Sequence, residues 1–195
     1  LNPSAVICEV MNEDGRMARL KDLKKFSMKH KIKIASIEDL IAYRLRNEKL
    51  ISKLSIKQSP IPKRKNEFEC LFYENKLNKL KNLVIKKGKF NSNKAVRVRV
   101  ISSNFRNMKL LFNDLKVKNS LKHLSKFNNF IMIIINNNKI DKNEKDNITL
   151  RYYGIGAQII KDLKVKNMIL VTRTRKKIIG LEGFGLKIKK QEIIK

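Results

Sequence analysis

Hydrophobic residues recur along the chain with two periods, and segments of the two kinds alternate. Apolar residues three or four positions apart predict helices at 20–30, 37–43, 108–127 and 156–164. Short apolar or alternating runs predict strands at 5–10, 31–35, 67–73, 82–87, 95–101, 130–135 and 167–172, with a final strand after GLEGFG. This alternation of strands and helices predicts an α/β fold.

Local signals sharpen some of these boundaries. Residues 12–15 (NEDG) predict a turn, and Ser36 with Asp39 three positions later predicts a helix N-cap. Pro60 and Pro62 lie in a stretch that has little apolar periodicity and many lysines. We therefore expect three parts along the chain: a first domain piece at 1–48, a linker at 49–66 and a second domain at 67–195.

The charge is strongly positive, with 46 basic and 17 acidic residues giving +29. Such a field favours anionic partners, including nucleic acid and phosphorylated metabolites. Lysine, asparagine and isoleucine share AT-rich codons, however, and the lysines are spread along the whole chain. We therefore interpret the charge mainly as codon bias. Nonspecific nucleic-acid binding is the weaker hypothesis, and it requires an affinity that falls steeply with salt.

Several classes of protein are excluded or disfavoured. The two cysteines, Cys8 and Cys70, are too few for a disulfide framework or a four-thiolate metal site. The longest apolar run, Phe130–Ile135, is far shorter than the roughly 20 residues that span a bilayer. No segment has the pattern of a signal peptide, so we expect a cytoplasmic protein without a membrane partner. Because the first residue is leucine, we expect a processed fragment or an incomplete reading frame.

The first part of the chain carries a long specific match. Residues 5–44, AVICEVMNEDGRMARLKDLKKFSMKHKIKIASIEDLIAYR, resemble the end of 3,4-dihydroxy-2-butanone 4-phosphate synthase. The resemblance implies conversion of ribulose 5-phosphate to a four-carbon riboflavin precursor and formate, with Mg²⁺. It also implies that Glu9 is an active-site carboxylate, which suits a reaction that moves protons between carbon and oxygen. Without the resemblance, Glu9 would be interpreted as a solvated side chain.

The rest of that synthase site is missing from the sequence. The family's acidic loop, its metal-binding glutamate and histidine, and its phosphate-binding region all precede the matched segment. One carboxylate is too few to hold Mg²⁺ without a substrate's oxygens. We therefore expect this chain alone to lack synthase activity and bound Mg²⁺.

The second part resembles GTP cyclohydrolase II in the forms fused behind that synthase. The resemblance rests on LRYYGIGAQIIKDLKVKNMILVT (150–172) and RKKIIGLEGFGL (175–186). It implies opening of the guanine imidazole ring by a zinc-bound water, with three thiolates holding the metal. Here Asn104 stands where the first thiolate is expected, and no cysteine follows Cys70. We therefore expect no zinc, and a degenerate cyclohydrolase-like domain.

Some substrate-side positions remain. In the family's Asp-x-Arg pair the acid accepts a proton and the arginine attacks phosphate; here these positions are Thr149 and Arg151. Thr172 and Lys177 align with the family's GTP-contacting threonine and lysine, and Arg175 lies between them. These residues predict residual phosphate binding, and the alternative is a solvated basic surface.

Three functional hypotheses remain. The first is a riboflavin-pathway protein that is inactive as this chain alone. The second is a non-catalytic module that binds a phosphate or nucleotide, or that dimerises, beside a synthase; a homodimer is the state implied by both families. The third is nucleic-acid binding. GIGAQI at 154–159 is not interpreted as a dinucleotide site, because Ile159 replaces the third glycine.

Overall fold

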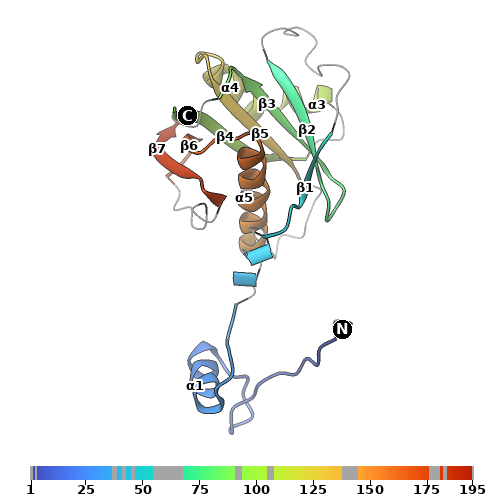
Figure 1. Cartoon of the computed structure of the whole chain (residues 1–195), viewed down its shortest axis with the longest axis vertical. Coiled ribbons are helices and arrows are strands. Elements are labelled where there is room, and N and C mark those ends of the chain that lie inside the picture. The colour runs from blue at the N-terminus through green and yellow to red at the C-terminus, as the bar shows by residue number, and fades with distance from the viewer. Residues whose placement is uncertain are drawn as a thin grey trace. The chain divides into compact units, whose positions relative to one another are not determined.

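The structure is a computed structural model of the chain, shown as a cartoon in Figure 1. The residues that it describes are 2, 4–36, 39–40, 43–44, 47–54, 68–90, 94–104, 108–137, 145–175, 181 and 184–194, with side chains left out at 145–153. The chain divides into two compact units, Leu1–Leu40 (unit 1) and Ile41–Lys195 (unit 2). Each unit is described by itself.

Unit 1 contains one helix and a turn. Helix α1 (Leu20–His30) has the predicted bounds, and the turn is confirmed because the Gly15 N–H donates to the Asn12 carbonyl at 2.9 Å. The strands predicted at 5–10 and 31–35 are wrong. Within the described residues of unit 1, the β-type pairing is a single bridge between Met11 and Met17. A strand without a neighbour leaves its backbone groups unpaired, so neither apolar run forms one.

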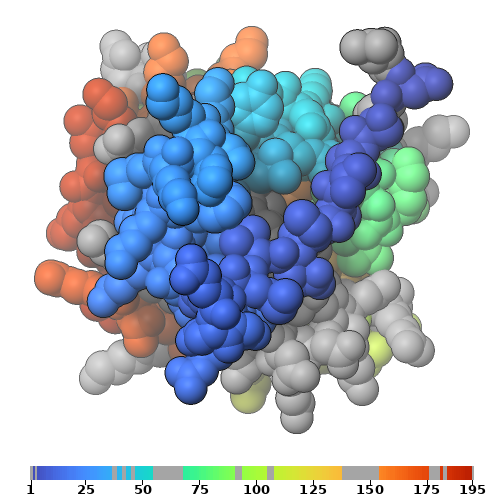
Figure 2. All heavy atoms as spheres, turned by 90° about the horizontal axis from the view of Figure 1, so that it is seen from below, coloured from blue at the N-terminus to red at the C-terminus, as the bar shows by residue number. Residues whose placement is uncertain are grey.

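Among the described residues of unit 1, no apolar side chain is buried. Val6 is 97% exposed and Ile7 is 94% exposed, and none of the residues of α1 is buried. Figure 2 shows the first residues, in dark blue, as an extended tail. The Ser36 N-cap is confirmed: its hydroxyl donates to Asp39 Oδ2 at 2.7 Å and accepts from the Asp39 N–H at 3.0 Å.

Unit 2 is built on one sheet. Across the described residues, seven strands pair in the order β1-β2-β3-β5-β4-β6-β7. The strands are β1 (Ile51–Leu54), β2 (Glu69–Asn75), β3 (Lys81–Lys87), β4 (Val96–Ser103), β5 (Phe130–Asn136), β6 (Asn167–Thr172) and β7 (Lys187–Ile193). The pairs β1·β2, β2·β3 and β3·β5 are antiparallel. The pairs β5·β4, β4·β6 and β6·β7 are parallel.

Most predicted strands of this unit are confirmed, with ends displaced by two residues at most. Strand β1 is different, because it lies inside the predicted linker 49–66. Ile51 is buried and pairs with Asn75 of β2, so the segment before the prolines belongs to the sheet. The prolines themselves lie outside the described residues.

The helices of unit 2 differ from the predictions in their bounds. The helix predicted at 108–127 is two helices, α3 (Met108–Asn113) and α4 (Leu115–Leu124). Asp114 separates them with an extended backbone, and its carboxylate accepts from the Lys116 N–H at 2.7 Å as the N-cap of α4. Helix α5 (Lys145–Asp162) begins well before the predicted residue 156. Its first three residues (KDN) are polar, so apolar periodicity does not mark where the helix begins.

The sheet is covered on both faces. Helix α5 packs on one face, in a core that includes Ile131, Ile133 and Ile159. Helices α3 and α4 pack on the other, in a core that includes Met132, Ile134 and Leu124 (Figure 1). Burial on both faces explains why β5 is continuously apolar. The α/β prediction is confirmed. Of the helices in the described part of the chain, none has the length and apolar character needed to cross a bilayer.

Candidate functional site

A crevice opens where strands β4 and β6 separate. Their parallel pairing runs from Val96–Met168 to Val98–Leu170 and goes no further in the described residues. Beyond that point a cavity of about 390 Å³ lies between the carboxyl halves of the two strands. Its lining includes Arg99, Ser102, Thr172, Arg173, Thr174 and, from α4, Lys116.

The topology explains why the crevice is here. After β4 the chain passes through α3 and α4 to β5 on one side of β4, whereas after β6 it continues to β7 on the other side. Neighbouring parallel strands whose connections leave in opposite directions leave a gap at their carboxyl ends, and ligands of open α/β sheets bind in such gaps. The fold therefore points to this crevice as the candidate site.

Arg99 is the principal crevice residue that the sequence did not single out. It is 7% exposed, its Nη1 donates to the Val171 carbonyl at 3.0 Å, and its Nε donates to Ser120 Oγ at 3.4 Å. A buried guanidinium thus ties β4 to β6 and α4 beside the crevice. The sequence shows Arg99 only as a polar position on an alternating strand, which would normally face solvent. Its side chain is recognised as buried only when α4 is seen to cover that face of the sheet.

Three buried side-chain oxygens at the carboxyl ends of β5 and β6 have no hydrogen-bond partner among the described residues: Asn136 Oδ1, Asn137 Oδ1 and Thr172 Oγ1. Buried polar atoms are normally paired, so unpaired ones need an explanation. Thr172 is the one that lines the crevice. Its hydroxyl is a free donor and acceptor beside basic residues.

A second polar cluster fixes β7 near the same face of the sheet. Arg97 Nε donates to Glu192 Oε2 at 3.0 Å, and His123 Nε2 lies 2.7 Å from Glu192 Oε1. The guanidinium also stacks 3.6 Å from the Phe127 ring centroid. Burial raises the pKa of Glu192, but the hydrogen bonds from His123 and Arg97 outweigh it and hold this pKa below its ordinary value. The His123 side chain therefore has a structural role, because it is paired with Glu192 of β7.

Comparison with known proteins connects this geometry to two families. Residues 1–43 match the 3,4-dihydroxy-2-butanone 4-phosphate synthase family, and residues 124–193 match the GTP cyclohydrolase II family. The second match begins at the end of α4 and covers β5, α5, β6 and β7. It therefore includes the β6 side of the crevice.

Whole-chain comparisons agree. The chain is 34% identical to riboflavin biosynthesis protein RibBA of Aquifex aeolicus, over 100% of this chain and 54% of that protein. It is 32% identical to RibBA of Endomicrobium trichonymphae, over 97% of this chain and 53% of that protein. The chain is a relative of the bifunctional riboflavin biosynthesis proteins. The resemblance predicted from the sequence is confirmed, and the chain spans about half the length of the curated relatives it matches.

A solved structure has a similar fold. It is RibBX, described as a two-domain 3,4-dihydroxy-2-butanone 4-phosphate synthase from A. baumannii. The two structures align with a TM-score of 0.72 and 28% sequence identity, over 96% of this chain and 53% of that one.

The zinc of the cyclohydrolase family does not fit the residues present. Asn104, at the position expected for the first thiolate, directly follows β4 and is exposed. Cys70 is buried on β2, three strands from β4 in the sheet order, which is roughly 14 Å at ordinary strand spacing. Among the described residues, no three His, Cys, Asp or Glu side chains gather closely enough to hold a metal ion.

The predicted site residues have different outcomes. Thr172 is buried at the end of β6 in the crevice, and Arg175 is exposed three residues later. Arg151 and Thr149 lie in the N-terminal half of α5, with side chains outside the described set, and Lys177 lies outside the described residues. Glu9 is exposed in unit 1. Residues 154–159 lie within α5 rather than at a strand-to-helix turn, so rejecting a dinucleotide fingerprint was correct.

Proposed function

We propose that the chain serves riboflavin biosynthesis as a cyclohydrolase-like domain that accompanies a dihydroxybutanone phosphate synthase and does not itself open GTP. The observation that carries the proposal is the set of side chains at the carboxyl end of β4. Asn104 offers an amide where zinc needs a thiolate, and the cysteine of the same unit, Cys70, is buried on β2, three strands from β4 in the sheet order. Without a metal-bound water, hydroxide is scarce at neutral pH, and the ring-opening step loses its nucleophile.

The synthase part of the proposal rests on unit 1. Residues 1–43 match that family, but Glu9 lies on an exposed stretch, and it belongs to no group of three or more His, Cys, Asp or Glu side chains that could hold a metal ion among the described residues. One exposed carboxylate cannot position Mg²⁺ and a sugar phosphate together. The 195-residue chain by itself is therefore expected to be inactive on ribulose 5-phosphate, and no bound Mg²⁺ is expected.

The direct test is a GTP ring-opening assay on the purified chain with added zinc, with the RibBA protein of Aquifex aeolicus as the comparison enzyme. The expected result is no turnover and no zinc retained after dialysis, measured by elemental analysis. Zinc-dependent turnover by the purified chain would falsify the proposal.

A second measurement defines the synthase role. The intact mass of the native product in its source cells distinguishes a chain near 22.8 kDa from one about twice as heavy. The heavier product would carry a synthase with an inactive tail, and its activity on ribulose 5-phosphate is then expected. A heavier product with no such activity would contradict the synthase assignment.

A second candidate function is binding of a phosphorylated nucleotide without turnover, and the crevice favours it. The unpaired Thr172 hydroxyl lies with Lys116 and Arg173 around a cavity large enough for a phosphate-bearing ligand. Cations and hydroxyl donors together form charge-assisted hydrogen bonds to phosphate oxygens.

Calorimetric titration of GTP into the chain tests this candidate. Lys116→Gln is expected to weaken binding about tenfold, as loss of one charge-assisted bond implies. Lys118→Gln is the matched control, because Lys118 is exposed two positions along the same helix and does not line the crevice. Absence of binding at millimolar GTP, or equal losses in both variants, rules the crevice out.

A further inference from the structure

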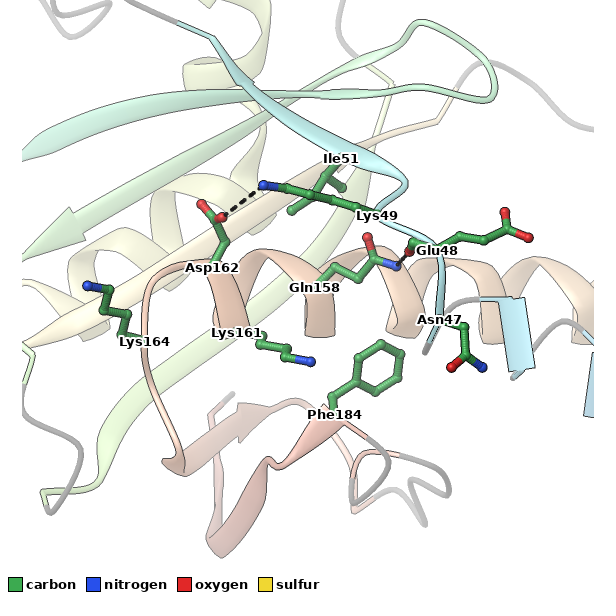
Figure 3. Close-up of a pocket in the computed structure, with 9 residues that line it drawn as sticks. All are labelled: Asn47, Glu48, Lys49, Ile51, Gln158, Lys161, Asp162, Lys164 and Phe184. Atoms are coloured by element: carbon green, nitrogen blue, oxygen red, sulfur yellow. Dashed lines mark hydrogen bonds and ion pairs between the residues drawn. The ribbon is translucent and has the colours of Figure 1, made fainter.

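A second cavity lies away from the crevice, beside the C-terminal end of α5. Its volume is about 420 Å³, within the range of small-molecule sites. Figure 3 shows that its lining comes from three places in unit 2: the segment Asn47–Ile51, the last turns of α5 with Lys164, and Phe184. Helix α5 runs antiparallel to its preceding strand, so this end of the helix is remote from the carboxyl ends of β4 and β6.

The wall of this cavity is fixed by a buried side chain. Gln158 is 8% exposed; its Oε1 accepts from the Leu50 N–H at 3.0 Å, and its Nε2 donates to the Glu48 carbonyl at 2.8 Å. One amide therefore holds two backbone groups of the segment 48–50 against α5. Because both ends of this amide are paired within the chain, this wall of the cavity is held in place without a ligand.

The acidic groups of the cavity are already engaged. Glu48 forms two hydrogen bonds with Arg44, at 2.8 and 2.9 Å, and its carboxylate points away from Phe184 in Figure 3. Asp162 accepts from the Tyr73 hydroxyl at 2.8 Å and lies 3.9 Å from Lys49. Burial and that hydrogen bond raise the pKa of Tyr73, so its hydroxyl stays a donor to Asp162.

The remaining charge is positive and lies beside an aromatic ring. The ammonium end of Lys161 points toward the Phe184 ring in Figure 3, and Lys164 lies at the outer edge of the cavity. Phe184 is buried in the core on the α5 side of the sheet, with its exposed part on the cavity. Ile51, which is 2% exposed and belongs to the same core, also lines the cavity.

From this combination we infer that the cavity binds a small aromatic molecule carrying one phosphate or similar anionic group. The ring lies against Phe184 and Ile51, and the anion is bound by Lys161. The cavity is unrelated to the zinc chemistry of the cyclohydrolase family, and the inference does not depend on the proposed function. A ligand here also contacts the segment 47–50, which leads from unit 1 into the sheet.

Calorimetric titration of the 195-residue chain with 1-naphthyl phosphate tests the inference. Saturable binding at one site is expected. Neutral 1-naphthol is expected to bind roughly tenfold more weakly, because it lacks the charge-assisted contact. Inorganic phosphate is expected not to bind, because it has no ring to bury. No binding at millimolar naphthyl phosphate, or equal binding of phosphate alone, overturns the inference.

Single-residue variants test whether 1-naphthyl phosphate binds in this cavity. Lys161→Gln is expected to weaken naphthyl phosphate binding about tenfold, and Phe184→Leu about fivefold through loss of ring stacking. Lys166→Gln is the matched control, since Lys166 is exposed shortly after the end of α5 and does not line the cavity. If Phe184→Leu fails to fold, the naphthol comparison still tests the ring and the charge. If Lys116→Gln weakens naphthyl phosphate binding and Lys161→Gln does not, the probe binds in the crevice and the assignment to this cavity is wrong.

Discussion

Units 1 and 2 come from one chain with the same lysine-rich composition, yet they differ in what their apolar residues do. In unit 2 the strand β5 is buried at every position from Phe130 to Ile135. In unit 1 the apolar run that includes Val6 and Ile7 is almost fully exposed. Both runs have strand-like sequences, so the difference lies in their neighbours. A strand pattern produces a strand only where other strands pair with it and a helix covers it.

The same contrast appears in the helices. Helix α1 has the predicted bounds but buries none of its residues, whereas α4 buries Val117, Ser120 and Leu124. Local signals are enough to begin and end α1: Asp22 Oδ2 accepts from the Arg19 N–H at 2.9 Å, and Lys31 adopts a left-handed backbone at the other end. Tertiary burial is a separate contribution, and unit 1 lacks it among its described residues.

The largest expected effect is that of a core truncation. Ile133→Ala removes a fully buried side chain from the middle of β5 and is expected to lower the free energy of unfolding by about 3–4 kcal/mol. Ile7→Ala, the matched truncation in unit 1, is expected to change it by less than roughly 0.5 kcal/mol. Urea unfolding followed by circular dichroism measures both. Similar losses in the two variants would break the contrast between the units.

Two glycines give a smaller effect of the same kind. Gly88 (φ +84°) and Gly15 (φ +79°) both adopt left-handed backbones, but a Cβ on Gly88 would lie 2.6 Å from the Asn128 carbonyl oxygen. A Cβ on Gly15 would meet nothing within 4 Å. Gly88→Ala is expected to destabilise unit 2 by roughly 2–3 kcal/mol through strain and clash. Gly15→Ala is expected to leave the melting temperature of unit 2 unchanged, as scanning calorimetry would measure; a matching fall in both variants would contradict this.

The smallest expected effect depends on pH. The pKa of Glu192 is lower in the folded chain than in the unfolded one, so its contribution is present above the unfolded pKa and is lost as pH falls through the folded pKa. Glu192→Gln is expected to cost on the order of 1 kcal/mol at neutral pH and to flatten the loss of stability below about pH 4.5. Asp22→Asn, on exposed α1, serves as the control and is expected to leave unit 2 unaffected. Urea midpoints measured from pH 3 to 7 test both, and an unchanged acid limb in Glu192→Gln would refute the assignment.

Most strands of unit 2 could be predicted from the sequence, because their pattern of apolar residues matches the positions that are buried in the sheet. The strands at 130–135 and 167–172 are confirmed for this reason. Periodicity failed at the start of α5, where Lys145 and Asp146 carry no apolar signal, and at Asp114, where one carboxylate divides a continuous apolar period into two helices.

The candidate site was predicted only in part. Thr172 was found through family resemblance, and the structure places it in the crevice. Arg99 and Lys116 were missed because their relation to Thr172 depends on where β6 and α4 pack, which spacing along the chain does not encode. Gln158 was missed for the same reason: its partners Glu48 and Leu50 lie 110 and 108 positions away.

Strand β1 has a practical consequence for making unit 2 on its own. It forms the edge of the sheet beside β2, and Tyr73 of β2 is fully buried. An expression fragment that starts at residue 67, after the prolines, would lack β1. It would expose the backbone N–H and C=O groups of β2 that pair with β1, together with a row of apolar side chains. Open sheet edges of this kind recruit strands from other molecules, so such a fragment would self-associate, whereas one that starts at residue 44 keeps β1 and the Gln158 contacts.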